Sequence, residues 1–351
     1  MTETWPWATH FVAHGLYFAT ATCGLPPRAT SGAMDTVLAD WRRGRIDATE
    51  FDAVIAHART RYAGLVGVAP STVAIGHQVS PLVALVAGSL ADGSRVLTAT
   101  GEFTSLTFPF AAQEHRDVSV REVPLEGLAD AIDEHTDLVA VSAVQSSSGA
   151  IADLDAIAEA ADRHRARVLV DLTQAAGWLP IDAARFAYTV CGAYKWLLSP
   201  RGTAFLTVRP DLLDSIVPTQ AGWYAGEQPW DSIYGLPLRL AHDARRLDVS
   251  PAWFLWAGTT ASLGFLERIG IEALHGHALA VEAAFAEAAD LQPGGSAIRS
   301  LTADERVAGL MADIDAVASV RAGRLRLSFH VNNTVAEAEQ LGRLLRGRVF
   351  E

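Results

Sequence analysis

The residue whose type says most about chemistry is Lys195, because it is the only lysine in the chain and every other one of the 28 basic side chains is arginine. A guanidinium does not lose its proton in proteins, so arginine cannot replace a neutral amine. A Schiff base with an aldehyde requires such an amine. Lys195 also follows the apolar segment 188–194, at a predicted strand end. We therefore predict that Lys195 anchors a cofactor or substrate covalently; the alternative is a surface lysine retained by chance.

Asp171 is the second candidate, because it ends the apolar run that begins at residue 167. A carboxylate at such a position is unfavourable unless a cation accompanies it. The protonated pyridine nitrogen of pyridoxal 5'-phosphate (PLP) is such a cation. An aspartate beside it keeps the nitrogen protonated, so that the ring can act as an electron sink. The alternative is a helix cap at a strand-to-helix turn. Taken with Lys195, Asp171 predicts a PLP site.

Between about residues 70 and 210, apolar runs of strand length alternate with helical patterns. The runs are continuous, which is typical of strands covered on both faces. This pattern predicts an α/β fold with a mostly parallel sheet sandwiched by helices, and ligands bind such sheets at the carboxyl ends of the strands. The predicted strands are 71–76, 94–100, 117–124, 137–144, 167–174, 189–195 and 203–209, and the predicted helices are 81–92, 104–115, 125–135 and 154–166.

The pattern changes after about residue 240, where two long amphipathic helices precede short strands and a last helix. That last helix is predicted to begin at a cap formed by Asn333 or Thr334. We predict a large domain over 15–240 and a smaller C-terminal α+β domain over 241–351, with 1–14 joined to the smaller one.

Composition narrows the class of protein. The net charge is −12 and there is no long basic run, which disfavours nucleic acids and anionic membranes as partners. Only two cysteines occur, so a reducing cytoplasm is the expected location. No apolar stretch reaches membrane-spanning length without interruption, the N-terminus does not resemble a secretion signal, and no metal site is predicted.

Two segments carry a family resemblance. "VDLTQAAGWLPID" and "AYKWLLSPRGTAFLTV" resemble fold-type I PLP enzymes of the aminotransferase class V superfamily. That superfamily includes cysteine-desulfurase-like enzymes, kynureninase, isopenicillin N epimerase-like enzymes and C–S lyases. The resemblance implies Lys195 as the Schiff base, Asp171 on the pyridine nitrogen, Gln174 over the phenolic oxygen and Tyr194 close to the phosphate.

Upstream segments extend the resemblance. "AIGHQVSPLVALV" is similar to the helix start that binds the cofactor phosphate, which implies His77, Gln78 and Val79 near that anion. "TGEFTSLTFPF" resembles the segment whose ring stacks on the cofactor, which implies Phe103; the alternative is a core position. "SAVQSSSGA" resembles the following loop, from which Ser146 approaches the cofactor.

Downstream segments imply an assembly and a substrate contact. "WAGTTASLGFLERIG" is similar to the segment whose threonine, here Thr259, reaches the phosphate of a neighbouring subunit, which implies a homodimer with shared active sites. "RLRLSFHVNNT" resembles the terminal pattern whose arginine holds the substrate α-carboxylate. We assign that role to Arg326; Arg324 is the alternative.

Two features separate this chain from particular members of the superfamily. It has no cysteine after Cys191, and phenylalanine replaces the histidine that desulfurases use at the stacking position, so persulfide transfer is not expected. Gln174 stands where kynureninase has histidine, which disfavours kynurenine hydrolysis. If Trp223 and Tyr224 face the site, the substrate is bulky and partly apolar; aromatic packing is the alternative.

The shared first step is removal of the substrate Cα proton by Lys195, after which elimination, transamination and epimerisation diverge. Motifs that bind the cofactor do not select among them. We expect a β-eliminating C–S lyase acting on a bulky cysteine conjugate in specialised metabolism. An aminotransferase or epimerase acting on a bulky amino substrate is the alternative, and a non-catalytic PLP-binding protein is the competing class.

Overall fold

The centre of the molecule is a seven-stranded sheet in the order β1-β7-β6-β5-β4-β2-β3. The computed structural model describes residues 5–351. The five strands from β6 to β3 are mutually parallel, β7 is antiparallel to β6, and β1 is antiparallel to β7. The strands are β1 (Val73–Gly76), β2 (Arg95–Ala99), β3 (Ser119–Val123), β4 (Leu138–Ser142), β5 (Arg167–Asp171), β6 (Tyr188–Gly192) and β7 (Ala204–Val208).

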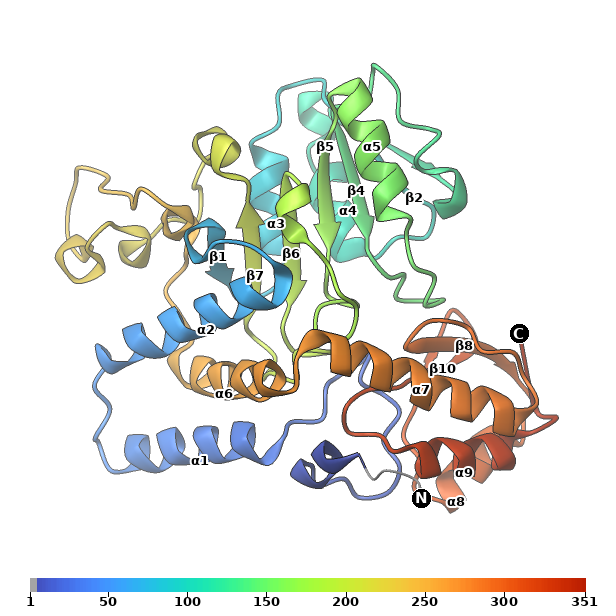
Figure 1. Cartoon of the computed structure of the whole chain (residues 1–351). Helices are drawn as coiled ribbons and strands as arrows, with labels where there is room; N and C mark the ends of the chain where they lie inside the picture. The colour runs from blue at the N-terminus through green and yellow to red at the C-terminus, as the bar shows by residue number, and fades with distance from the viewer. Residues whose placement is uncertain (1–4) are drawn as a thin grey trace.

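Helices cover both faces of this sheet (Figure 1). Successive residues of β5 show why: Val168 and Val170 pack into one core with α2 and α5, whereas Leu169 packs into another with α3 and α4. The continuous apolar runs are therefore explained by burial on both sides, and the predicted α/β sandwich is confirmed. The helices of this part are α1 (Arg28–Arg42), α2 (Glu50–Val66), α3 (Val79–Gly88), α4 (Thr104–Ala111) and α5 (Leu154–His164).

The helix predicted over 125–135 is wrong. A single 3-10 turn spans Leu125–Gly127, and turns follow it up to β4. The carboxylate of Asp133 accepts hydrogen bonds from the backbone N–H of His135 (2.9 Å) and the hydroxyl of Thr136 (3.0 Å). Such local side-chain bonds offer the backbone an alternative to a helix, which a count of apolar residues does not register.

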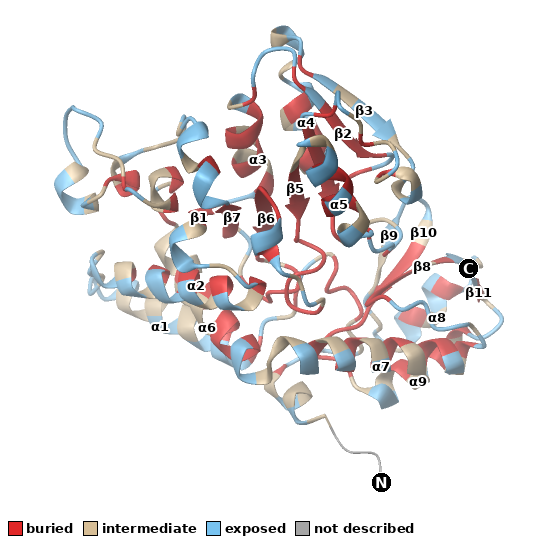
Figure 2. Ribbon diagram, turned by 45° about the horizontal axis from the view of Figure 1, so that its top comes forward, coloured by how far each residue is buried: buried red, intermediate tan, exposed pale blue. Residues whose placement is uncertain are grey.

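The C-terminal part forms a second, four-stranded antiparallel sheet in the order β11-β8-β10-β9. It packs with α7 and α9 around its own core, and Figure 2 shows its buried strands beside the main sheet. Thr334, not Asn333, caps α9 through a reciprocal box with Glu337. The elements are α6 (Trp253–Ile269), α7 (Ile271–Ala289), β8 (Ile298–Ala303), α8 (Val307–Asp313), β9 (Ser319–Arg321), β10 (Arg324–Ser328), α9 (Val335–Leu345) and β11 (Val349–Phe350).

The N-terminal segment joins the two sheets. Tyr17 bridges to Val317, and Phe18 is fully buried in the core of the C-terminal sheet. By contrast, α6 packs into the core of the large sheet. The domain limits at residues 14/15 and 240/241 stay predictions. Across residues 5–351 no helix combines the length and apolar character needed to cross a bilayer.

Candidate active site

A cavity with about 620 Å³ of empty space lies where β4, β5 and β6 end. The carboxyl ends of parallel strands are the expected place for a ligand. Nine of the predicted site residues line it, whereas Thr259, Arg326, Trp223 and Tyr224 do not. The lining consists of His77, Gln78, Val79, Phe103, Ser105, Ser142, Ser146, Asp171, Thr173, Gln174, Gly192, Tyr194, Lys195, Arg201 and Thr203.

Lys195 follows β6 and is 5% exposed. Burial lowers the pKa of its amine to about 8; Asp171 opposes this shift, and the cations Arg326 and Arg321 reinforce it. Its Nζ lies 5.3 Å from the centroid of the Phe103 ring. No residue within 5–351 accepts a hydrogen bond from Nζ, so the amine is available for covalent chemistry.

The turn that carries Lys195 is held by close backbone contacts. Leu198 adopts a φ of +55°, which is sparsely populated by non-glycine residues. The N–H of Gly24 donates to the carbonyl of Tyr194 at 2.8 Å. A Cβ at Gly24 would lie 2.1 Å from the carbonyl oxygen of Lys195, so only glycine fits this approach. A segment near the N-terminus therefore fixes the position of the lysine backbone.

Asp171 is the last residue of β5 and is 4% exposed. Burial raises the pKa of its carboxyl to about 6, Thr173 and Lys195 lower it, and Glu102 adds to the rise. Among the described residues, its hydrogen bonds come from Thr173, whose N–H lies 2.8 Å away. Asp171 is therefore a buried acid that a cationic ring nitrogen would stabilise.

The start of α3 provides a place for an anion. Its N-cap residue, Gln78, makes no side-chain capping bond, so the first backbone N–H groups are free to bind a phosphate. Tyr194 and Val79 converge there, since a Cβ built on Gly192 would lie 3.4 Å and 3.5 Å from their side chains. The guanidinium of Arg201 lies 5.3 Å from the centroid of the Tyr194 ring and adds a permanent cation.

Arg201 and Thr203 are cavity residues that the sequence analysis did not select. Both lie in the short turn between the Lys195 segment and β7. The signal that could have indicated Arg201 is an arginine and a glycine in the turn directly after a candidate lysine. Arg201 has no ion pair within residues 5–351, which suits a group that neutralises a bound phosphate.

Phe103 is 44% exposed and is the N-cap residue of α4. Its backbone N–H donates to Oε1 of Glu102 at 2.7 Å, and the same carboxylate accepts from the hydroxyl of Ser142 at 2.6 Å and from Gln145 at 2.9 Å. Glu102 is buried and was also missed, because a single acid before an aromatic residue carries no distinctive pattern. It fixes the turn that presents the Phe103 ring to the cavity.

Gln174 lines the cavity, but its hydrogen bonds differ from those expected. Its Nε2 donates to the carbonyl of Ala21 and the hydroxyl of Ser146, both at 3.0 Å, and its Oε1 accepts from Trp196 at 2.8 Å. An amide nitrogen has two N–H groups, and both are in use. This arrangement leaves no donor for a phenolic oxygen, so it does not support that expected contact.

Arg326 lies directly behind Ser146 and is 1% exposed. It donates to the carbonyl (2.6 Å) and hydroxyl (3.0 Å) of Ser146 and to the hydroxyls of Thr22 (2.7 Å) and Ser319 (3.1 Å). All these acceptors are neutral, and burial lowers the pKa of Arg326 to about 10. A buried guanidinium without a carboxylate partner favours binding of an anion. Arg324 instead donates to Ser300 and Thr302.

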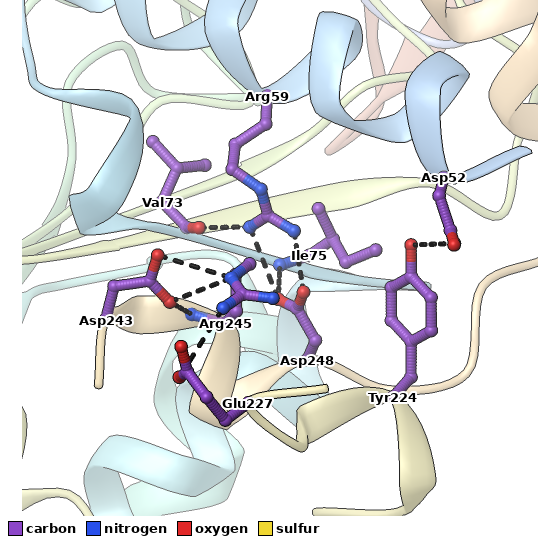
Figure 3. Close-up of polar contacts among 9 residues, drawn as sticks. All are labelled: Asp52, Arg59, Val73, Ile75, Tyr224, Glu227, Asp243, Arg245 and Asp248. Carbon is purple, nitrogen blue, oxygen red and sulfur yellow. Dashed lines mark hydrogen bonds and ion pairs between the residues drawn. The ribbon is translucent and has the colours of Figure 1, made fainter. Parts of the chain in front are cut away.

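The remaining predicted residues lie elsewhere. Thr259 is fully buried, and its hydroxyl bonds with that of Thr203 at 2.9 Å, so its position does not support a contact with a phosphate in another subunit. Tyr224 donates to Asp52 at 3.2 Å, beside α2 (Figure 3). Trp223 packs against Tyr224 and Trp230. Their assignment as substrate-binding residues is not supported in this chain's own cavity, because aromatic packing occupies both.

The groups of the cavity fit PLP. The amine of Lys195, which has no hydrogen-bond partner among residues 5–351, fits the aldehyde, and the buried acid fits the ring nitrogen. The open N-terminus of α3 fits the phosphate, and the exposed ring of Phe103 fits the face of the cofactor ring.

Comparisons with known proteins agree with this assignment. The sequence pattern of the family described as "Aminotransferase class-V" matches residues 47–312. The uncharacterized aminotransferase YcbU of Bacillus subtilis is 32% identical over 339 residues, 88% of this chain and 87% of that protein. Isopenicillin N epimerase of Amycolatopsis lactamdurans is 30% identical over 234 residues, 60% of this chain and 58% of that protein. The structure of the cystine C–S lyase C-DES with cysteine persulfide matches with a TM-score of 0.84 at 22% identity, over 95% of this chain and 97% of that one.

The two sheets and the lysine at the strand ends define a PLP-dependent enzyme of fold type I. The chain belongs to the aminotransferase class V family. The predicted family, fold and cofactor are thereby confirmed.

Proposed function

We propose that this protein is a β-eliminating C–S lyase, which converts a cysteine S-conjugate and water into a thiol, pyruvate and ammonium. The choice of elimination is supported by the similarity of the whole fold to the cystine C–S lyase C-DES. The groups that would act are Lys195, a base with a lowered pKa, and Arg326, a buried cation with no carboxylate partner among residues 5–351. Bound PLP would supply an aldehyde to Lys195 and a ring that takes up the electron pair left at Cα.

Each side chain at the site would have a separate role in the reaction. Arg326 binds the substrate α-carboxylate and orients Cα toward Lys195. The Nζ of Lys195 accepts the Cα proton, because its lowered pKa leaves an appreciable neutral fraction near neutral pH. With PLP bound, Asp171 would hold a proton on the ring nitrogen, and Phe103 would supply an aromatic surface for the ring.

The thiols of this chain support elimination without an enzyme persulfide. Cys191 is 1% exposed and burial raises the pKa of its thiol far above the ordinary value, so it is not a nucleophile. Cys23 is exposed but does not line the cavity. The sulfur would therefore leave as a free thiol. With Trp223 and Tyr224 outside the cavity, a bulky apolar conjugate lacks support; homodimerisation, cytoplasmic location and a role in specialised metabolism stay predictions.

Transamination is the second candidate, and it is favoured by the relationship to YcbU, which is named an aminotransferase. The test is to incubate the PLP-loaded protein with a panel of S-substituted cysteines without any 2-oxo acid. A lyase releases pyruvate, ammonium and thiol in equal amounts. If turnover requires an added 2-oxo acid and the cofactor accumulates in its amine form, the protein is a transaminase and the lyase proposal is wrong.

A further inference from the structure

The guanidinium groups of Arg321 and Arg326 both contact the hydroxyl of Thr22, and Arg326 also contacts the cavity residue Ser146. Arg321 ends β9, and its Nη2 lies 3.4 Å from the hydroxyl of Thr22. The Nη2 of Arg326 donates to the same hydroxyl at 2.7 Å. The other contact of Arg321 is with the backbone carbonyl of Val320 at 2.8 Å. Two cations therefore share one neutral acceptor.

Neither arginine has an ion pair with a carboxylate anywhere in residues 5–351, although most other arginines of the chain do. Placing like charges together is unfavourable, and an anion between or beside them removes that penalty. Burial lowers the pKa of Arg326 to about 10, and the charge of Arg321 is the next cause. Among the described residues, the pair therefore takes no part in the protein's own ion pairs and leaves its positive charge uncompensated.

The two arginines lie at different depths. Arg326 is almost fully buried and contacts Ser146, which lines the cavity. Arg321 is exposed and lies on the solvent side of Thr22. An acid with one carboxylate on Arg326 therefore has a second cation nearby, because both guanidinium groups contact the hydroxyl of Thr22. Contacts link Arg321 to the cavity, because the hydroxyl of Thr22 joins it to Arg326, which donates to the cavity residue Ser146.

We propose that Arg321 is a specificity residue that binds a second carboxylate, so that the preferred substrate is an amino acid whose side chain also ends in a carboxylate. The proposal rests on the proposed function in one respect, namely that Arg326 takes the α-carboxylate. In the elimination, the distal carboxylate would leave with the thiol.

Binding of non-reacting acids to the PLP-loaded protein tests this separately from turnover. Calorimetry compares linear dicarboxylates, from succinate to adipate, with the monocarboxylates of equal chain length. At least one dicarboxylate should bind about 10-fold more tightly than its monocarboxylate counterpart, as expected for one additional charged hydrogen bond. Arg321→Gln should remove this preference and change the monocarboxylate dissociation constant by less than about 2-fold.

Arg324→Gln is the matched control, because Arg324 lies on the same hairpin but is held by Ser300 and Thr302. It should keep the dicarboxylate preference, and Arg321→Lys should keep part of it. The proposal is overturned if no dicarboxylate is preferred, if the preference survives Arg321→Gln, or if Arg324→Gln abolishes it equally. Failure of Lys195 to form a visible-absorbing adduct with PLP would instead contradict the proposed function.

Discussion

Two buried acids, Asp248 and Asp171, are each influenced by a basic group, Arg59 and Lys195, but only Asp248 forms an ion pair with its base in the described chain. Burial raises the pKa of both acids to about 6. Asp248 accepts from Arg59 at 2.6 Å and from the backbone N–H of Ile75 at 2.8 Å (Figure 3). The carboxylate of Asp171 is bonded by Thr173 alone within the described chain.

The bases differ as well. Arg59 keeps its proton. It lies in α2 and donates to the carbonyl of Val73 in β1 and to Asp248 in the segment before α6, so it connects these three parts of the chain. Lys195, with its pKa lowered to about 8, can change its protonation state near neutral pH. A buried acid near a base therefore indicates reactivity when the base can titrate and the hydrogen bonds of the acid are incomplete, and it indicates a structural role otherwise.

The largest expected effect comes from removing the reactive base. Lys195→Ala should lower turnover by about 10⁴-fold, because the same amine anchors the cofactor and accepts the proton. The folded protein should persist, since no described residue bonds to Nζ. Turnover assays and circular dichroism measure the two effects. Covalent capture of PLP by the variant after borohydride treatment would contradict the assignment.

Breaking the structural pair should affect stability instead. Arg59→Met leaves Asp248 buried without its cation, and we expect a loss of about 3–5 kcal/mol in the free energy of unfolding. A double variant, Arg59→Met with Asp248→Leu, should recover part of that loss. Denaturant unfolding measures both. A single variant that unfolds like the wild type would remove the distinction between the two acids.

Asp171→Asn should lower turnover by about 100-fold and stabilise the cofactor-free protein. The folded-state pKa of about 6 lies above the ordinary value of 3.8, so the folded state binds the proton more tightly and loses stability as the pH rises between these values. At pH 7 the variant should gain up to about 3 kcal/mol. Equal stability of variant and wild type at pH 7 would show that the buried, ionised carboxylate of Asp171 does not destabilise the folded protein.

The lowered pKa of Lys195 predicts a pH dependence. The rate at which cofactor-free protein combines with PLP should rise about 10-fold per pH unit up to about pH 8 and then level off, because only the neutral amine attacks an aldehyde. Stopped-flow absorbance measures the rate, with Nα-acetyl-lysine as the control for the chemistry of the aldehyde. A rate that still rises between pH 9 and 10 would indicate an ordinary lysine.

The smallest effect concerns the region around the structural pair. Tyr224→Phe removes the hydrogen bond to Asp52 and should reduce stability by about 1 kcal/mol, while kcat/KM changes by less than about 2-fold. Thermal unfolding and steady-state kinetics measure the two. A large fall in kcat/KM with stability unchanged would indicate that Tyr224 contacts the substrate.

The sequence predicted the sheet and the two central side chains because continuous apolar runs and a unique lysine are local features. It did not predict Glu102, whose bond with Ser142 joins residues 40 positions apart, or Arg201, whose contact with the Tyr194 ring depends on how the intervening turn folds. The assignments of Trp223 and Tyr224 to the substrate stay predictions, because residue type does not show which partner an aromatic ring packs against, and within this chain the two contact Trp230 and Asp52. The helix over 125–135 failed because turn-forming bonds from Asp133 outweighed an apolar pattern.

The contact between Gly24 and the backbone beside Lys195 has a consequence for biosynthesis. The same N-terminal segment bonds to β10, through the carbonyl of Phe18 with the N–H of Ser328 (2.9 Å) and the N–H of Ala21 with the hydroxyl of Ser328 (3.1 Å). Ala21 and Ser328 are 307 positions apart in the chain, so the N-terminal segment cannot find this partner until β10 has been synthesised. The wall behind the lysine is therefore completed only after β10 has been synthesised, so a nascent chain acquires its reactive amine before the surroundings that lower the pKa of that amine.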